Sequence, residues 1–190
     1  SHSACTTADG TAAKVKAGIR TFDPRGRSSA FNARNIAAEQ DETASAYWDW
    51  DNITFLNTIF GPALNDSIHP DDESQANCPC SPHGYGPLFQ LVPANHPASL
   101  SMIGNLLAHQ VGRNPYSLVP RFAFVNNVVY NAEEHTLHLF AVDMPTYNSV
   151  VGNVFIRGPN FRNPFGPILI GMNTGPLLTG SRVYVADNVA

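Results

Sequence analysis

The sequence predicts an all-β fold of the solenoid type, a parallel β-helix, and three observations support this prediction. The first is a recurring frame in which a short β-rich run is followed by an asparagine and two mostly apolar residues. The frame occurs in four stretches: Leu100–Leu107, Phe122–Val129, Val150–Phe155 and Arg182–Val189. Repeats of about 20–30 residues that each carry one short strand motif are typical of solenoids.

The second observation is the position of the asparagines in this frame. Asn105, Asn127, Asn153 and Asn188 follow one another at intervals of 22, 26 and 35 residues. An earlier copy puts Thr58 in the same place, 47 residues before Asn105, or about two periods. Each circuit must bend sharply, and asparagine tolerates the left-handed conformation that such a bend requires. We therefore expect the asparagines to stack as a hydrogen-bonded ladder, with the β-turns of a sandwich as the alternative.

The third observation is composition. Charged residues make up only 14 % of the chain, whereas helical bundles are rich in them. Proline, glycine and asparagine separate the strand-like runs after Leu100, as expected for short strands joined by turns. The one segment with a helical pattern lies near Ala30–Glu42.

The 190 residues are enough for one domain with its own core. We expect residues 1–35 to form an irregular N-terminal segment or an incomplete coil, and residues 36–190 to form the β-helix domain. Residues 61–98 read as a long loop, and loops of this length are often functional. This loop is a candidate wall for a binding groove.

Charge and hydropathy exclude several classes of partner. The net charge is −4 and the only lysines are Lys14 and Lys16, so nucleic acid is not an expected partner. No stretch approaches the roughly 20 apolar residues of a membrane span, so a membrane is not expected either. Three cysteines are too few for a disulfide scaffold.

Two further motifs suggest metal sites, and the sequence favours neither. The YWDW string at residues 47–50 resembles one found in tyrosinases, but the histidine pairs that hold copper in that family are missing. Cys78, Cys80, His83 and His69 could hold zinc. Because two prolines stiffen this loop and no second cysteine pair exists, a tight loop is the preferred reading.

Four strings in order carry a resemblance to a known family: ALNDSIHP (63–70), HGYG (83–86), IGNLLAHQVGRNP (103–115) and FAFVNNVVYN (122–131). Together they resemble the pectate lyases of polysaccharide lyase family 1. In that family Arg-x-Pro follows an NLLAH-type string, and paired asparagines come thirteen residues after the arginine. Arg113 precedes Asn126 and Asn127 at this interval. The resemblance covers about residues 36–190.

The resemblance implies a right-handed parallel β-helix that cleaves polygalacturonate-type polysaccharide by calcium-assisted β-elimination. The N-terminal coils of the family are not recognisable in residues 1–35, so the expected β-helix lacks them. A hard cation held by carboxylates would stabilise the charge that develops when the proton α to a carboxylate is removed. The family's base maps to Arg113, although a guanidinium is normally fully protonated. Arg113 could instead clamp the substrate carboxylate through two parallel hydrogen bonds.

The remaining candidate residues come from the same comparison. Asp41 and Glu42 are the first candidates for calcium ligands, and Asp49 and Asp51 are the second choice. The substrate-binding candidates are Arg121, His83 and His109. His109 could also have a structural role at a corner of the coil. Leu118 stands where the family has a second arginine, and Ser45 stands where it has a further carboxylate.

The expected partner is therefore an acidic, pectate-like polysaccharide, and the expected location is secreted or extracellular. The alternative from another class is a non-catalytic β-helix, either a glycan-binding module or a virion-tail or structural module. A third alternative is a structural fragment that self-associates or needs a companion chain to complete its coils.

Overall fold

A computed structural model of the chain describes residues 20–21, 36–37, 43–46, 51–63, 84–90, 98–141, 144–162, 165–171 and 177–190. Among these residues none is helical, and the strands form three sheets. The first sheet contains β1 (Arg20–Thr21), β5 (Thr58–Phe60), β8 (Leu106–Ala108), β11 (Val128–Tyr130) and β14 (Val154–Ile156). The second contains β16 (Arg182–Ala186), β13 (Tyr147–Val151), β10 (Arg121–Val125), β7 (Ser99–Ile103) and β4 (Ile53–Leu56). The third contains β15 (Ile168–Ile170), β12 (Leu137–Leu139), β9 (Tyr116–Ser117), β6 (Leu88–Phe89), β3 (Ser45–Ala46) and β2 (Ile36–Ala37).

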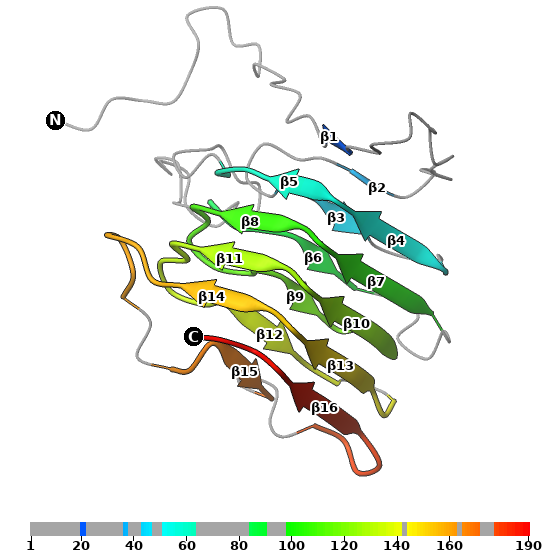
Figure 1. Ribbon diagram of the computed structural model, residues 1–190. Helices are drawn as coiled ribbons and strands as arrows, with labels where there is room; N and C mark the ends of the chain where they lie inside the picture. The colour runs from blue at the N-terminus through cyan, green and yellow to red at the C-terminus, as the bar shows by residue number, and fades with distance from the viewer. Residues whose placement is uncertain are drawn as a thin grey trace, which may run out of the picture.

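The chain visits the three sheets in a fixed order, so that each circuit adds one strand to the third, the second and the first sheet in turn. Strands of successive circuits pair in parallel, as the stacked arrows in Figure 1 show. The antiparallel pairs are β1 with β5 and β2 with β3, at the N-terminal end of the stack. The predicted all-β fold with parallel strands is confirmed.

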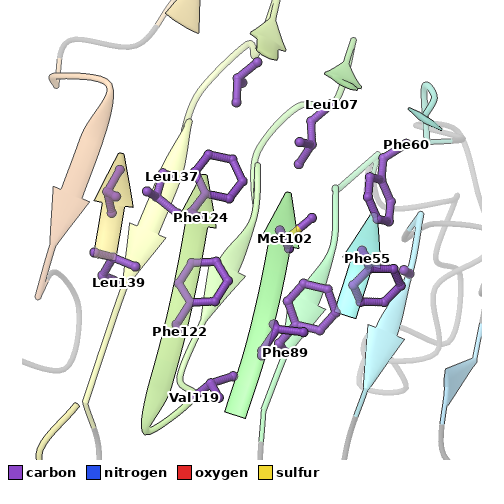
Figure 2. Packing of buried hydrophobic residues seen from close by; sticks show 14 of the residues in the cluster. Phe55, Phe60, Phe89, Met102, Leu107, Val119, Phe122, Phe124, Leu137 and Leu139 are labelled. Carbon is purple, nitrogen blue, oxygen red and sulfur yellow. The ribbon is translucent and has the colours of Figure 1, made fainter. Parts of the chain in front are cut away.

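The core lies between the sheets and is built from side chains that repeat in register. Phe55, Met102, Phe124 and Val150 occupy equivalent inward positions of β4, β7, β10 and β13, and each is completely buried. Figure 2 shows Phe55, Met102 and Phe124 of this row together with Leu137 and Leu139 of β12 in the third sheet. Aromatic rings fill the N-terminal part, where Phe55 lies 5.4 Å from both Phe60 and Phe89 between ring centroids.

The four repeat asparagines form a continuous ladder, which confirms the prediction that they stack. The side-chain oxygens of Asn127, Asn153 and Asn188 each accept hydrogen bonds from the backbone N–H and the side-chain amide of the preceding asparagine. The side-chain distances are 2.9 Å from Asn105 to Asn127, 3.0 Å from Asn127 to Asn153 and 2.9 Å from Asn153 to Asn188. Each amide also donates to a backbone carbonyl oxygen of the preceding circuit, so the buried column satisfies its own polar atoms.

The sharp bend, however, lies one residue before each ladder position, not at the ladder asparagines as expected. Positive φ angles occur at Asn57, Gly104, Asn126, Gly152 and Asp187. A Cβ on Gly104 would lie 2.6 Å from Oδ1 of Asn57, and one on Gly152 would collide with Oδ1 of Asn126. Each amide therefore folds over the glycine of the next circuit. The corner residue supplies the left-handed backbone, and the ladder residue supplies the amide.

Strand β2 lies in the segment near Ala30–Glu42, and β1 lies in the N-terminal part of the chain. Two local expectations are wrong. The backbone N–H of Thr58 donates directly to Oδ1 of Asn105 at 2.8 Å, so their separation of 47 residues is one long circuit and not two periods. Residues 61–98 include β6, which pairs with β3 and β9. Two-residue strands carry no measurable period, and sequence patterns therefore miss them.

Candidate functional site

The candidate site lies on the outer side of the third sheet. Leu137 and Leu139 point into the core from β12, so His138 between them must point outward, because successive strand residues face opposite sides of a sheet. The register places His138 beside Tyr116 of β9. Both side chains are thus held at fixed positions on two adjacent circuits.

Four rings form an outer aromatic cluster around His138 of β12. The other three are Tyr116 of β9, His135 just before β12 and Phe140 just after it. Tyr116 stacks on Phe140 at 4.5 Å between centroids, and His138 stacks on His135 at 4.7 Å. His138 also meets the edges of Tyr116 and Phe140 at 5.5 and 5.0 Å. Tyr116 and His135 are half-buried, so the cluster presents ring surface to solvent.

Arg113 lies next to this cluster, in the connection between β8 and β9. Its side chain is half-buried, and its guanidinium carbon lies 4.5 Å from the centroid of the Tyr85 ring. Cation–π contacts of this kind favour a charged group over an aromatic face. The backbone N–H of Gly86 donates to the carbonyl of Gly112 at 2.8 Å, and a Cβ at Gly86 would collide with the carbonyl oxygen of Arg113. A glycine at position 86 therefore lets the two loops approach closely and fixes Arg113 beside Tyr85.

The electrostatics of the cluster keep His138 neutral at neutral pH. The pKa of His138 is lowered to about 4, mainly by burial and in addition by the nearby charges of His135 and Arg113. The Nε2 atom of His138 is buried and has no hydrogen-bond partner among the described residues. Burial raises the pKa of Tyr116, and the charge of Arg113 partly opposes that rise. At neutral pH the arginine is therefore the cation that the described cluster presents.

Acidification should destabilise the fold through His138. Its folded pKa of about 4 lies below the ordinary value of 6.5, so the unfolded chain takes up a proton first as the pH falls. The contribution of neutral His138 is complete above about pH 6.5 and is lost progressively toward pH 4, with about 2 kcal/mol lost by pH 5. Urea unfolding near pH 7.5 and pH 5 measures this loss. His138→Phe keeps a ring but removes the titrating group, so its free energy of unfolding should fall less between pH 7.5 and pH 5 than that of the wild type. Equal losses in the variant and the wild type would contradict the assignment to His138.

The two other described candidates have neighbours that differ from those of Arg113. Arg121 opens β10 in the second sheet, is exposed, and pairs in register with Ser99 and Tyr147. His109 follows β8 with a φ of 64°. Its Nδ1 lies 2.9 Å from Nδ2 of Asn131 in the next circuit, and its ring meets Tyr130 edge-on at 5.0 Å. His109 therefore joins two circuits at a corner, which is the structural role considered from the sequence.

The remaining candidates lie partly outside the described residues. His83, Asp41, Glu42 and Asp49 are among those that the structure does not describe, as are Cys78, Cys80 and the YWDW string. Asp51 is described, and its Oδ1 accepts hydrogen bonds from the backbone N–H groups of Asn52 and Ser99 at 2.7 and 2.8 Å. This carboxylate joins two circuits. Within the described ranges, no group of three or more His, Cys, Asp or Glu side chains comes close enough to hold a metal ion.

Sequence reasoning missed the residues around Arg113. The sequence alone assigns no role to His138, Tyr85 or Tyr116. Tyr85 does stand inside the HGYG string, and Tyr116 directly follows the Arg113-Asn114-Pro115 motif. The signal that would have found His138 is its place between two core leucines, since such a position faces outward from the sheet.

Comparisons of the chain with family models, with curated proteins and with solved structures return no match. The resemblance to the pectate lyases therefore rests on the four sequence strings. No helix among the described residues is long and apolar enough to cross a membrane.

Proposed function

We propose that the three sheets form a right-handed parallel β-helix whose third sheet binds an acidic polysaccharide of the polygalacturonate type and cleaves it by β-elimination. One observation carries this proposal: the half-buried guanidinium of Arg113 lies over Tyr85 and beside the outer aromatic cluster. The stacked circuits would offer a linear surface along which a polymer can extend. Such a substrate fits a secreted protein.

The roles of the described residues follow from their chemistry. The planar guanidinium of Arg113 binds a uronate carboxylate through two parallel hydrogen bonds. Tyr85 and Tyr116 offer ring faces that can cover the apolar face of a sugar. Neutral His138 supports Tyr116 from behind without adding a second buried cation. The cluster thus combines a carboxylate clamp with aromatic surface.

In the elimination, the proton on the carbon α to the carboxylate is removed and the bond from the β carbon to the glycosidic oxygen breaks. A carbon–carbon double bond forms, and the departing oxygen takes up a proton. Negative charge accumulates on the carboxylate during this step, and a fixed guanidinium stabilises it more in the transition state than in the ground state. The resemblance also gives Arg113 the role of the base, which a cationic guanidinium can perform only after losing a proton.

Calcium is the cofactor that the resemblance implies. The described residues do not offer a site for it, because none of their acidic, histidine or cysteine side chains group in threes. Asp41 and Glu42, outside the described residues, remain the proposed ligands, and bound calcium would supply positive charge to the substrate carboxylate. Arg121, His83 and His109 remain proposed contacts to the more distant sugars.

The test is the ultraviolet absorbance of the unsaturated uronate that elimination creates. The protein should generate this absorbance on polygalacturonate, and a calcium chelator should abolish it. Neutral glucans should give no signal. If polygalacturonate and related uronates with calcium present also give none, the lyase assignment is rejected.

A non-catalytic glycan-binding module is the second candidate, and one observation favours it. Leu118 stands in place of the family's second arginine, and its side chain is half-buried with its backbone N–H bonded to the carbonyl of Phe89 at 3.0 Å. Such a module would bind polygalacturonate in a calorimeter and release no unsaturated product. Loss of this binding in Tyr116→Ala would assign the sugar contact to the outer aromatic cluster.

A further inference from the structure

Among the described residues, β16 is the last strand of the second sheet, and it leaves part of the core uncovered. Val185 of β16 occupies the inward position that Phe55, Met102, Phe124 and Val150 occupy in the preceding circuits. Those four side chains are 0 % exposed, whereas Val185 is 49 % exposed. Figure 1 shows β16 at the end of the stack, opposite the antiparallel β1 and β2. An apolar strand edge of this kind favours pairing with another strand.

The backbone at this edge is also open. In each preceding circuit the corner residue donates its N–H to a carbonyl of the next circuit, and the ladder residue donates to the next side-chain oxygen. The corresponding N–H groups of Asp187 and Asn188 have no protein acceptor among the described residues. In the described part of the chain, β16 pairs with β13 on one side and with no strand on the other.

The side chains of β16 are complementary to their own reversed order. The strand begins with the exposed Arg182 and ends before the exposed Asp187, with Tyr184 at its centre and a valine on each side. An antiparallel neighbour centred on Tyr184 would place Val183 opposite Val185, and Arg182 within reach of Asp187. Apolar and opposite-charge pairs across antiparallel strands are stabilising, and like charges are not.

We propose that this edge binds a second copy of the same chain, with the two β16 strands paired antiparallel about a two-fold axis at Tyr184. The interface is self-complementary, as a two-fold interface requires: each copy supplies the same arginine, valines and aspartate. The two valine pairs cover the exposed end of each core, and the second sheets of the two copies become one continuous sheet. This dimer does not depend on the proposed lyase activity.

Charge exchange tests the arrangement in the 190-residue chain. The wild type should have twice the monomer mass by light scattering after gel filtration. Arg182→Asp and Asp187→Arg should each shift the mass toward the monomer, because each places like charges across the axis, and the double variant should restore the dimer. Arg121→Asp, at the equivalent position of the interior strand β10, should remain dimeric.

A disulfide cross-link fixes the register. In a chain whose three native cysteines are replaced by serine, Tyr184→Cys should form a cross-linked dimer on mild oxidation, because directly opposed residues of antiparallel strands come within disulfide distance. Ser149→Cys, the neighbour of Tyr184 on β13, should not. A monomeric wild type, a ladder of larger species, or a double variant that stays monomeric although it is folded by circular dichroism would overturn the proposal.

Discussion

Replacing Asn127 by leucine is expected to lower the free energy of unfolding by about 2–6 kcal/mol, since two buried donors would each lose an acceptor at about 1–3 kcal/mol. The two donors are the backbone N–H and one amide N–H of Asn105, which both bond to Oδ1 of Asn127 at 2.8 and 2.9 Å. Asn127 itself is completely buried, so water cannot replace the lost bonds without opening the corner. Chemical denaturation monitored by circular dichroism measures the change.

The neighbouring asparagine provides the matched control. Asn126 belongs to the same turn but is exposed, and its φ of 52° suits glycine, which already stands at the equivalent corner position 152. Asn126→Gly should therefore change stability by no more than about 1 kcal/mol. Equal losses in Asn126→Gly and Asn127→Leu would mean that the turn backbone, and not the ladder, carries the stability of this corner.

The ladder could be predicted because one position repeats a chemical demand in every circuit. A buried amide at this corner must pair with the amides before and after it, so asparagine recurs even though the circuit length varies between 22 and 47 residues. The residue before it must adopt a positive φ, which glycine, asparagine and aspartate all tolerate. The residue type at this corner position therefore varies between circuits, and the sequence predicts the bend at the ladder asparagine, one residue too late.

The third sheet could not be predicted in the same way. The strands β3, β6 and β9 are two residues long, which is too short for an alternation of apolar and polar residues to be recognised. They are specified mainly by pairing with neighbouring circuits, and Leu88 and Phe89 became a strand inside an expected loop. The same limit applies to the site, because Tyr85, Arg113 and His138 come from three circuits. Their proximity depends on strand register and not on spacing along the chain.

Arg113 nevertheless could be singled out, because its motif lies within one circuit. The string from Ile103 to Pro115 is continuous in sequence. It contains the last residue of β7, the ladder residue Asn105, the strand β8 and most of the connection to β9. A local motif survives changes in circuit length, whereas contacts between circuits do not. This explains why the motif finds the cation but not the rings around it.

Replacing Arg113 by alanine is expected to lower turnover on polygalacturonate by about a hundred-fold or more, with a much smaller effect on binding, because the guanidinium acts on charge that develops in the transition state. Arg113→Lys should restore little, since a point charge cannot make the two parallel bonds. Arg113→Ala should also raise the pKa of His138, because the charge of Arg113 helps to lower it. NMR titration of the histidines would detect this rise. Arg121→Ala, which removes an exposed side chain at the start of β10 in another sheet, should have a milder effect. Wild-type turnover in Arg113→Ala would leave the lyase standing and move its active site away from the third sheet.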